Sequence, residues 1–575
     1  MKVLGISCHF HDAGACLIED GRIVAAAAEE RFSRKKHDGS FPERAIRYCL
    51  EEGGIRGQDL HAVAMYEKPI QHFHRILASS VATFPWSLGS WLRAIPPWLN
   101  RKLWIKKLIR KELDFTGPVY FSEHHMAHAA SAFFLSPFDR AAILTMDGVG
   151  EWASATISTG SGNRIEMLGQ MNYPHSLGFL YSAFTYYLGF KVNSAEYKVM
   201  GLAPYGKPIY KDKIYQMIDL KDDGTFRLDM SYFAYHYGLH MTSRKFHDLF
   251  GEPPYERERN PTQREFNLAA SVQEVTEEII LKLVRNLHER TGEKNLCLAG
   301  GVALNCVANG RLLRESPFED IWVQPASGDD GGAIGAAIWL YNQVFEQARD
   351  VTMDDCYLGP SFSQDEIDRY LESCGVPHHR MGRDDLLKTT ARCIDQQDVI
   401  GWFQGRMEYG PRALGSRSIL ADARNPENKD VVNLKIKQRE SFRPFAPTVL
   451  ADKCSEYFDI DRETPYMLLV AQVREDHRVI PSVTHVNGSA RIQTINRVQN
   501  ELYYDLIKEF ENQTGVPVII NTSFNVRGEP IVCTPHDAFL CFMRTDMDVL
   551  VLGSSILYKR ECQDLTFEDR RIDLD

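Results

Sequence analysis

The sequence predicts an α/β protein built from a duplicated, strand-rich unit and a second α/β domain. A rhythm of strand, turn, strand and strand occurs at the start of the chain and again from Ala141. With 575 residues, 44% hydrophobic and 25% charged, the chain can bury more than one core. The helical pattern breaks at residues 346–362, in EQARDVTMDDCYLGPSF. We therefore expect two domains, over residues 1–350 and 356–565.

Apolar runs predict the strands of both repeated units. The expected strands of the first unit cover residues 3–7, 15–18 and 23–28, with a turn at Asp20-Gly21. Those of the second cover residues 141–146, 153–158 and 165–169, separated by DGVGE and TGSGN. Two such units favour a nucleotide or metal site in the cleft between the halves. This organisation resembles that of the actin and sugar-kinase superfamily.

The lengths of the apolar segments and the glycine turns that end them predict the remaining elements. Helical spacing of apolar residues predicts a long helix over residues 263–292 that ends at Thr291-Gly292. Strands at 295–299 and 321–323 run into the glycine turns Gly300-Gly301 and PASGDDGG, where a ligand can approach the backbone. Short buried-type strands at 399–404, 518–520 and 549–552 indicate the second α/β domain.

The charge distribution favours small anions as ligands. The net charge of −11 and the isoelectric point near 6.0 argue against nucleic acid as a bulk partner. Residues 405–443 are the exception, with nine Lys/Arg against five Asp/Glu. Glycines and prolines interleave these cations, so rigid turns can present guanidinium groups to phosphate oxygens. A solvated basic patch is the alternative.

Cysteine usage and the first residues predict a cytoplasmic protein. Twelve cysteines are scattered without a CxxC pair. Lys2 leads directly into a strand-like run rather than into an apolar leader. Both features are typical of a reducing compartment.

One stretch invites a membrane interpretation. Residues 76–92 are uncharged, and a basic helix-like segment follows from Arg101. Pro85, Gly89 and the short length argue against a transmembrane helix. A helix lying on a membrane surface and a packed helical flap both remain, and we favour the packed flap. The same stretch is also a candidate for contact with a substrate.

His124 and His128 are four residues apart in HHMAHAASAF and would share one helix face, whereas His125 would point elsewhere. Such a pair can bind one metal ion, although a structural role is commoner. The glutamate of a zinc-protease HExxH helix is absent, so peptide hydrolysis lacks its usual base.

Several longer motifs, taken together, resemble the NodU/CmcH carbamoyltransferase family. In the second domain they are GPRALGSRS, SFRPFAP, ARIQT and NTSFNVRGEPIV. Earlier in the chain they are CHFHDAGACLIEDG, EERFSRKKH, EHHMAHAASAF, MDGVGE, EYKVMGLAPYG, AGGVALNCVANG and PASGDDGGAIGAA. The resemblance spans nearly the whole chain. It implies an actin-like (ASKHA, TsaD-like) N-terminal domain and a YrdC-like C-terminal domain.

The resemblance also implies roles for residues of the first domain. The metal ligands would be His124, His128, Asp147 and Asp329, holding a divalent ion, Fe²⁺ by analogy with the family. His11, Asp12 and Lys36 would lie near the transferring group, where a His or Asp could take a hydroxyl proton. Asp147 would be a further ligand or a base. Nucleotide contacts in this domain would come from Gly300, Gly301 and Asn305.

In the second domain, the resemblance implies a site for carbamoyl phosphate and ATP. Clustered cations and Mg²⁺ would hold the several negative charges of these two substrates. The matching residues are Arg412, Lys437, Arg443, Arg491, Arg527 and Asn521.

The function expected from this resemblance is ATP-dependent O-carbamoyl transfer. Carbamoyl phosphate and ATP would give carbamoyl-adenylate, and the carbamoyl group would pass to a hydroxyl of a sugar, oligosaccharide or antibiotic-like acceptor. We expect no nucleic-acid partner and no transmembrane segment, and a homodimer would be unsurprising. An actin-like small-molecule kinase and a non-catalytic nucleotide-binding regulator are the alternatives.

Overall fold

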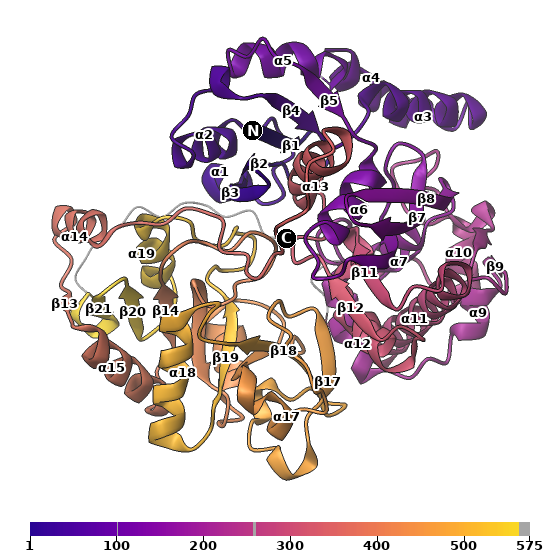
Figure 1. The fold of residues 1–575 in the computed structure, drawn as a ribbon. Coiled ribbons are helices and arrows are strands. Elements are labelled where there is room, and N and C mark those ends of the chain that lie inside the picture. Colours follow the sequence, from indigo (N-terminus) through magenta and orange to yellow (C-terminus); the bar gives the residue numbers. More distant parts are fainter. Residues whose placement is uncertain (101, 257–259, 563–575) are drawn as a thin grey trace. The chain divides into compact units, whose positions relative to one another are not determined.

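The computed structural model describes residues 1–575 except 101, 257–259 and 563–575 (Figure 1). The chain divides into two compact units. Unit 1 comprises Met1–Glu29 and His37–Met353, and unit 2 comprises Glu30–Lys36 and the chain from Asp354 onward. The sequence predicts Glu30–Lys36 in the first domain, but the contacts of this segment place it in unit 2.

The first half of unit 1 is a five-stranded sheet in the order β3-β2-β1-β4-β5. β2 pairs antiparallel with both β1 and β3, whereas β4 pairs parallel with β1 and β5. The central strands β1 and β4 are buried along nearly their whole lengths, which explains their continuous apolar sequences. The strands are β1 (Lys2–Ser7), β2 (Gly14–Glu19), β3 (Arg22–Ala28), β4 (Ala62–Met65) and β5 (Val119–Phe121).

The second half of unit 1 repeats this sheet strand for strand. Its order is β12-β11-β6-β7-β8, with β7 antiparallel to β6 and β8, and β11 parallel to β6 and β12. The strands are β6 (Arg140–Met146), β7 (Ala153–Ser161), β8 (Arg164–Asn172), β11 (Asn295–Ala299) and β12 (Asp320–Val323). The predicted duplication is therefore confirmed, and unit 1 has the actin-like fold.

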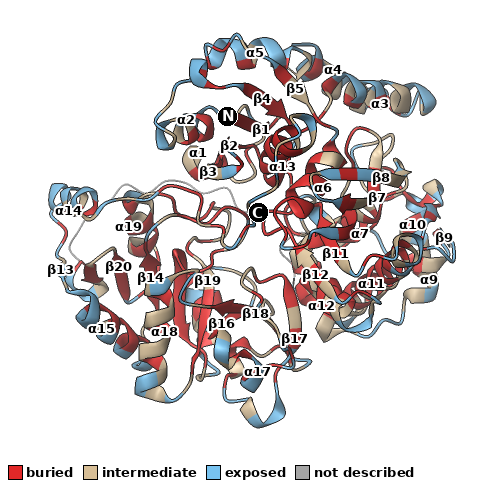
Figure 2. Cartoon of the chain, viewed as in Figure 1, coloured by how far each residue is buried: buried red, intermediate tan, exposed pale blue. Residues whose placement is uncertain are grey.

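Two helices meet at unusually short range in the interior of unit 1. They are α6 (His124–Phe133) and α13 (Gly331–Trp339), which are buried along most of their lengths (Figure 2). A Cβ atom at Gly335 would lie 1.9 Å from the carbonyl oxygen of Ala127. Only glycine permits this approach, so the crossing is fixed by the absence of a side chain.

The predicted long helix is α11 (Gln263–Thr291). Thr262 and Glu265 form a capping box at its start, and Gly292 adopts a left-handed conformation at its end. The other helices of unit 1 are α2 (Glu43–Glu52), α3 (Pro69–Ala82), α4 (Leu88–Asn100), α5 (Ile105–Glu112), α7 (Leu177–Tyr187), α8 (Glu196–Leu202), α9 (Lys211–Tyr215), α10 (Arg244–Phe250) and α12 (Cys306–Glu315). A separate hairpin is formed by β9 (Ile218–Leu220) and β10 (Phe226–Leu228).

Unit 2 is built on a mixed nine-stranded sheet in the order β13-β21-β20-β14-β15-β19-β16-β18-β17. The strands are β13 (His379–Arg380), β14 (Ile400–Phe403), β15 (Arg417–Asp422), β16 (Ala446–Leu450), β17 (Leu469–Gln472), β18 (Ser489–Ile495), β19 (Val518–Ser523), β20 (Val549–Leu552) and β21 (Ser555–Tyr558). The predicted strands 399–404, 518–520 and 549–552 correspond to β14, β19 and β20, and the α/β class is confirmed.

Helices pack on this sheet through large apolar side chains. α15 (Arg383–Asp395) and α18 (Glu501–Thr514) enclose a core that includes Leu387, Trp402 and Phe510. Full burial of each such side chain contributes about 1.5–3 kcal/mol. The other helices of unit 2 are α1 (Glu30–Ser33), α14 (Gln364–Ser373), α16 (Asn428–Asp430), α17 (Cys454–Tyr457) and α19 (Pro535–Met543).

Residues 76–92 form the end of α3, a turn and the start of α4. Within the described part of the chain, no helix combines the length and hydropathy that a membrane span requires.

The α6–α13 crossing generates a stability prediction. We expect Gly335→Ala to destabilise unit 1 by about 1–3 kcal/mol, because the added methyl group meets backbone atoms that cannot rotate away. Thermal unfolding followed by circular dichroism should show a lower Tm. Gly89→Ala, in α4, is the matched control: no atom lies within 4 Å of its Cβ position, so we expect an unchanged or higher Tm. Equal behaviour of the two variants would contradict the tight crossing.

Candidate active sites

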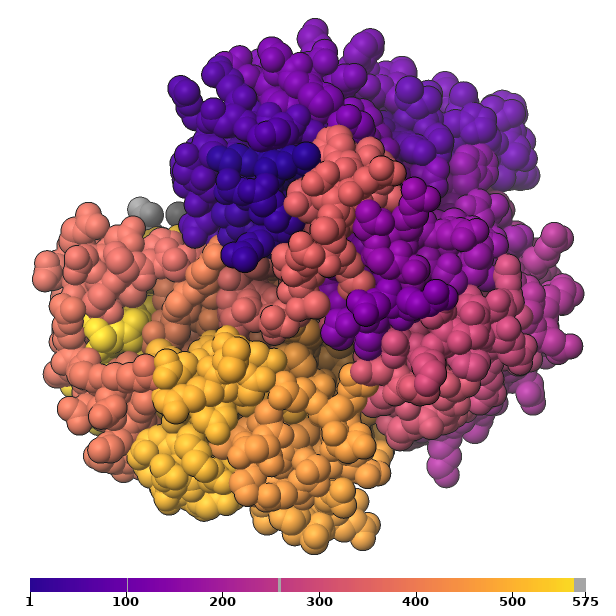
Figure 3. All heavy atoms as spheres, viewed as in Figure 1, coloured from indigo at the N-terminus to yellow at the C-terminus, as the bar shows by residue number. Residues whose placement is uncertain are grey.

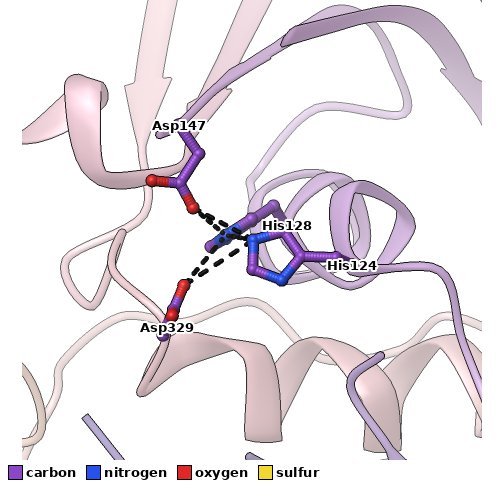
Figure 4. A group of neighbouring side chains, drawn as sticks. All are labelled: His124, His128, Asp147 and Asp329. Atoms are coloured by element: carbon purple, nitrogen blue, oxygen red, sulfur yellow. Dashed lines mark hydrogen bonds and ion pairs between the residues drawn. The ribbon is translucent and has the colours of Figure 1, made fainter. Parts of the chain in front are cut away.

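Four predicted metal ligands converge in unit 1. His124 and His128 lie one turn apart on α6, Asp147 follows β6 directly, and Asp329 lies just before α13 (Figure 4). Both carboxylates point toward the two imidazoles, Asp147 from above and Asp329 from below in this view. The duplicated sheet and the α6–α13 crossing therefore bring together residues 205 positions apart in the chain (329 − 124).

The ligand atoms are close enough to surround one ion. The Nε2 atoms of the two histidines are 3.1 Å apart, and Asp147 Oδ2 lies 3.0 Å from the first and 3.3 Å from the second. Asp329 Oδ1 is 3.6 and 3.8 Å from the same nitrogens. All four atoms lie within 4.8 Å of one another.

The electrostatics of this cluster are those of a cation site. Burial alone would lower the pKa of His124, but hydrogen bonding to Asp147 and the charge of Asp329 raise it to about 10. Burial and the neighbouring Asp147 raise the pKa of Asp329. Two carboxylates crowded in a buried space repel each other, and a divalent cation would relieve that repulsion.

The imidazole orientations fit a metal bound through Nε2. Both Nε2 atoms face the carboxylates, while the Nδ1 atoms are buried and hydrogen-bond no described residue. Two neutral imidazoles and two carboxylates suit a divalent transition metal such as Fe²⁺, and do not distinguish it from Mn²⁺ or Zn²⁺. The donor set therefore fits the predicted group without identifying the metal.

Neighbouring residues hold the cluster in place. Glu151 accepts hydrogen bonds from the backbone N–H of His124 and of Lys68, which caps the start of α6. His125 points away, as predicted, with its ring nitrogens 2.7 Å from Thr145 Oγ1 and 2.9 Å from the carbonyl oxygen of Ala153. Burial and the charges of the other two histidines lower its pKa to about 3. His125 is therefore a neutral structural residue.

The predicted nucleotide residues lie beside this cluster. A Cβ atom at Gly301 would be 3.1 Å from Asp147 Oδ1, and one at Gly300 would be 2.2 Å from the carbonyl oxygen of Met146. Gly301 therefore leaves exposed backbone next to Asp147, whereas Gly300 is buried against the backbone of Met146. The side chain of Asn305 caps α12 and exchanges two hydrogen bonds of 3.0 Å with Gln273. Its amide is already committed within the protein.

A second cluster forms at the tip of the β1–β2 hairpin. Asp12 binds two imidazoles, with its oxygens 2.7 Å from His11 Nδ1 and 2.8 Å from His37 Nδ1. The two rings stack with their centroids 4.6 Å apart. His37 also contacts Ser194, with Nε2 to Oγ at 3.1 Å. The sequence analysis missed His37, whose only signal was its place in RKKH.

The backbone around this second cluster is strained. His9, Asp12, His37 and Asn193 all have positive φ angles between 43° and 75°. Non-glycine residues pay about 1–3 kcal/mol each for sparsely populated conformations, which persist only where surrounding contacts enforce them. Here the hairpin tip is fixed by hydrogen bonds from His9 N to Gly39 O and from Ala13 N to Asp38 O, at 2.6 and 2.8 Å.

The protonation states of His11 and Asp12 at neutral pH differ from those that a general base needs. Burial would lower the pKa of His11, but Asp12, and more weakly Asp329 and Glu196, raise it to about 9. Hydrogen bonds from both histidines depress the pKa of Asp12, against the effect of burial. At neutral pH His11 is therefore an imidazolium. The expectation that His11 or Asp12 accepts a hydroxyl proton is not what these charges favour.

Lys36 belongs to unit 2. Its segment is anchored there by Arg31, which donates to Gly410 O at 2.9 Å, and by Arg34, which donates to Ile531 O at 2.7 Å. Phe32 packs against the small apolar cluster around Met407. The charge of Lys36 acts on Lys437 of the same unit.

Lys437 is a buried lysine of unit 2. Its Nζ donates to the carbonyl oxygens of Ser523 and Asn525 at 2.6 and 2.8 Å. Burial lowers its pKa well below the usual value, and the charges of Arg439, Arg443 and Lys36 lower it further. An incoming anion would reverse this effect by favouring the charged ammonium.

The predicted arginines form two groups. Arg443 acts electrostatically on Lys437, and the backbone N–H of Arg527 donates to Lys437 O at 3.2 Å. Arg491 lies two residues before Gln493 on β18, so both share one face of the sheet. Gln493 in turn holds the loop that carries Arg412, by donating to Leu414 O at 2.8 Å. All four arginines are partly exposed.

Asn521 is buried in a polar network rather than presented to solvent. Its Nδ2 donates to Gln493 Oε1 at 2.7 Å and to Ala413 O at 3.3 Å. The side chain therefore positions the loop around Arg412. A direct phosphate contact is not what this placement favours.

Three cations of the basic segment 405–443 make their contacts within the protein. Arg417 is fully buried and donates to the carbonyl oxygens of Gln404 and Pro360 at 2.7 and 3.0 Å. Arg424 pairs with Asp422, and Arg406 donates to Leu358 O. These three cations are structural, which corrects the reading of the whole segment as a polyanion site.

Glu408 is an organising residue that the sequence analysis missed. Its Oε1 accepts hydrogen bonds of 2.7 Å from the backbone N–H groups of Leu414 and Ser416. The carboxylate thereby shapes the GPRALGSRS loop from inside. A charge-rich sequence context gave no signal that separates this glutamate from a surface residue.

Known protein families match the sequences of both units. A family model described as Carbamoyltransferase N-terminus matches residues 2–338, and one described as Carbamoyltransferase C-terminus matches residues 391–559. The protein sll1178 of Synechocystis sp. is 52% identical, over 97% of this chain and 96% of its own length. Nodulation protein NolNO of Sinorhizobium fredii is 40% identical, over 96% and 79%. Nodulation protein U of Rhizobium tropici is 29% identical, over 92% and 91%.

The metal cluster generates a binding prediction. We expect the purified protein to hold a divalent transition metal, and His128→Ala with Asp329→Ala to lose it, since each change removes a ligand. Inductively coupled plasma mass spectrometry after dialysis measures the content. His288→Ala, a histidine of unit 1 outside the cluster, should keep the metal. Equal metal content in all three proteins would exclude the cluster as the site.

The hairpin cluster generates a pKa prediction. His11 should titrate near pH 9 in the folded protein, so its charge stabilises the fold at lower pH, and this contribution is lost as the pH rises through 9. Asp12→Asn removes the main compensating charge, and the pKa of His11 should fall below 6.5, because burial then dominates. Histidine ring NMR resonances, assigned with His11→Gln, measure both values. An unshifted pKa in Asp12→Asn would contradict the cluster.

Proposed function

The chain belongs to the NodU/CmcH-type carbamoyltransferase family, and we propose that this carbamoyltransferase works through ATP and a carbamoyl-adenylate. The carbamoyl group would come from carbamoyl phosphate and pass to a hydroxyl of a sugar, oligosaccharide or antibiotic-like acceptor. The observation that carries the proposal is the separation of two chemically distinct sites. Unit 1 holds a buried His/Asp cluster suited to a metal, and unit 2 holds cations suited to phosphates.

The adenylating step is assigned to unit 2, which we take to be YrdC-like. Carbamoyl phosphate loses its phosphate to water, giving carbamate and inorganic phosphate. A carbamate oxygen then attacks the α-phosphorus of ATP, the bond to the β-phosphate oxygen breaks, and pyrophosphate leaves. Arg412, Arg443, Arg491 and Arg527, with Mg²⁺, would hold the phosphates for in-line attack.

Lys437 is suited to the departure of phosphate. Its environment disfavours the ammonium form in the absence of an anion, as the lowered pKa indicates. Phosphate binding would restore the positive charge next to the group that leaves. Lys437 would therefore be most fully protonated when the substrate phosphate is bound.

The transfer step is assigned to unit 1. The acceptor oxygen attacks the carbamoyl carbon, the bond from that carbon to the adenylate oxygen breaks, and AMP leaves, its phosphate taking the hydroxyl proton. A divalent metal held by His124, His128, Asp147 and Asp329 would supply Lewis acidity toward a carbonyl oxygen. The His11 imidazolium, oriented by Asp12, would donate a hydrogen bond to the developing phosphate charge. The exposed backbone of Gly301 would leave room for the adenylate beside Asp147.

The division of labour generates a kinetic prediction. Arg491→Ala and Arg527→Ala should each reduce carbamoyl-phosphate-dependent pyrophosphate release by about a hundredfold or more, because each removes a charge-assisted contact with phosphate. His124→Ala with His128→Ala should leave pyrophosphate release intact. Pyrophosphate is measured with ATP, Mg²⁺ and carbamoyl phosphate, and hydroxylamine traps the intermediate as hydroxyurea.

The matched control is Arg497→Ala, an exposed arginine of unit 2 paired with Asp505, which should release pyrophosphate as the wild type does. Omission of carbamoyl phosphate should abolish release. Production of ADP instead of pyrophosphate would favour the kinase alternative. ATP binding without turnover would favour the non-catalytic regulator. Loss of pyrophosphate release in the histidine double variant would contradict separate sites.

A further inference from the structure

The helix α3 buries polar side chains and exposes apolar ones. Its inner positions include His72 and Arg75, whereas Ile70 is 77% exposed and Val81 is 69% exposed. Ile70, Leu77 and Val81 follow one another at spacings of seven and four, so they form one stripe on the helix. This is the reverse of the pattern of a helix packed on a soluble core.

The following helix extends the same kind of surface. Leu88, Leu92 and Leu99 of α4 are exposed at spacings of four and seven, which again is one stripe. The connecting turn adds Phe84 and Trp86, the latter 78% exposed. Figure 2 shows α3 and α4 largely in tan and pale blue, and Figure 3 shows this region at the outer surface of unit 1.

The concentration of these residues is a property of one insert. We call residues 68–111, between β4 and β5, the helical insert. Among the described residues, nine of the seventeen exposed large hydrophobic side chains lie in it. They are Ile70, Leu77, Val81, Phe84, Trp86, Leu88, Leu92, Leu99 and Trp104. Scattered apolar residues on a surface need no explanation, but a contiguous set marks an interaction site.

The insert is also the most one-sided segment of the chain in charge. It contains nine Lys/Arg and no Asp or Glu, in a protein of net charge −11. Lys106, Lys107 and Arg110 of α5 are exposed and follow the exposed ring of Trp104. Four of the eight tryptophans of the chain lie in these 44 residues. Exposed cations beside apolar and tryptophan side chains are the composition of helices that lie in a membrane interface.

The inner face explains how the apolar face is held outward. Glu67 Oε2 lies 2.8 Å from His72 Nδ1, and Arg75 lies 2.7 Å from His72 Nε2. The Arg75 guanidinium also lies over the ring of Tyr173, at 5.1 Å. A buried chain of polar groups is stable only while each member keeps its partners. These polar contacts, together with packing of His72 and Phe73 against the buried ring of Trp98, hold α3 in its orientation.

We propose that the helical insert docks on the surface of a bilayer containing anionic lipids. The exposed stripes of α3 and α4 would enter the headgroup boundary, and the cations of α5 would contact lipid phosphates. This proposal does not depend on the carbamoyl-transfer proposal. The packed flap favoured by the sequence would bury side chains such as Ile70, Val81 and Trp86, which are exposed here.

Charge complementarity favours an anionic bilayer over a second copy of the chain as the partner of the helical insert. A two-fold dimer through the same face would bring two inserts, each with nine cations and no acids, against one another. Like charges at a desolvated interface oppose association. A bilayer with anionic headgroups supplies both the apolar phase and the opposite charge.

Sedimentation with vesicles tests the proposal on the full chain. We expect the wild type to pellet with vesicles of equimolar phosphatidylcholine and phosphatidylglycerol, and to remain in the supernatant with phosphatidylcholine alone or at high salt. Lys106→Glu with Lys107→Glu should weaken the partition by about tenfold or more. Trp86→Ser with Leu92→Ser should weaken it similarly, through lost apolar insertion.

Matched controls change the same residue types elsewhere. Ile209→Ser with Val498→Ser alters exposed apolar residues outside the insert, and Lys207→Glu with Lys388→Glu alters exposed lysines. Both should pellet as the wild type does. All the altered side chains are exposed, so circular dichroism should show unchanged folding, and pyrophosphate release should be unaffected.

Three results would overturn the proposal. The first is no pelleting of the wild type with anionic vesicles, and the second is equal pelleting of the insert variants and the controls. The third is a dimer, measured by sedimentation velocity without lipid, that Trp86→Ser with Leu92→Ser dissociates, because the face would then belong to a second copy.

Discussion

The close crossing of α6 and α13 is the constraint on which the site of unit 1 depends. Helices normally pack with axes about 8–10 Å apart, and the missing side chain of Gly335 lets these two come nearer. Asp329 precedes α13 and His124 begins α6, so the crossing sets the distance between carboxylate and imidazole. Two acids buried together would be costly alone. The imidazoles offset that cost, and the same charges leave a place for a cation.

The sequence predicted what depends on local spacing. Apolar runs predicted all five strands of the second sheet but only β1, β2 and β3 of the first, and the four-residue spacing of His124 and His128 located one side of the His/Asp cluster. It did not predict the partnership of His37 with Ser194, because those residues are 157 positions apart and no periodicity links them. The sequence also could not predict that Glu30–Lys36 belongs to unit 2. This assignment depends on backbone carbonyl oxygens of unit 2 that accept hydrogen bonds from the segment.

Charge counting failed in unit 2 for a related reason. A sequence gives the number of cations in residues 405–443 but not the oxygens around them. Arg417 binds backbone carbonyls in the interior, and Glu408 binds backbone N–H groups there, so neither is available to a ligand as the composition implied. Both instead make the loop of Arg412 rigid. A phosphate site needs this rigidity, since held donors lose little entropy when an anion binds.

Periodicity identifies the faces of a helix but not which face is buried. In α3 the apolar stripe of Ile70, Leu77 and Val81 is exposed, while His72 and Arg75 are inside. The reversal accompanies the contacts that His72 makes with Glu67 and Arg75 on the inner side of the helix. A hydrophobic core could have held α3 with the opposite face outward and left no exposed apolar surface. Holding it by polar contacts instead leaves an exposed apolar stripe, the kind of surface that marks an interaction site, in the same insert as the exposed cations of α5.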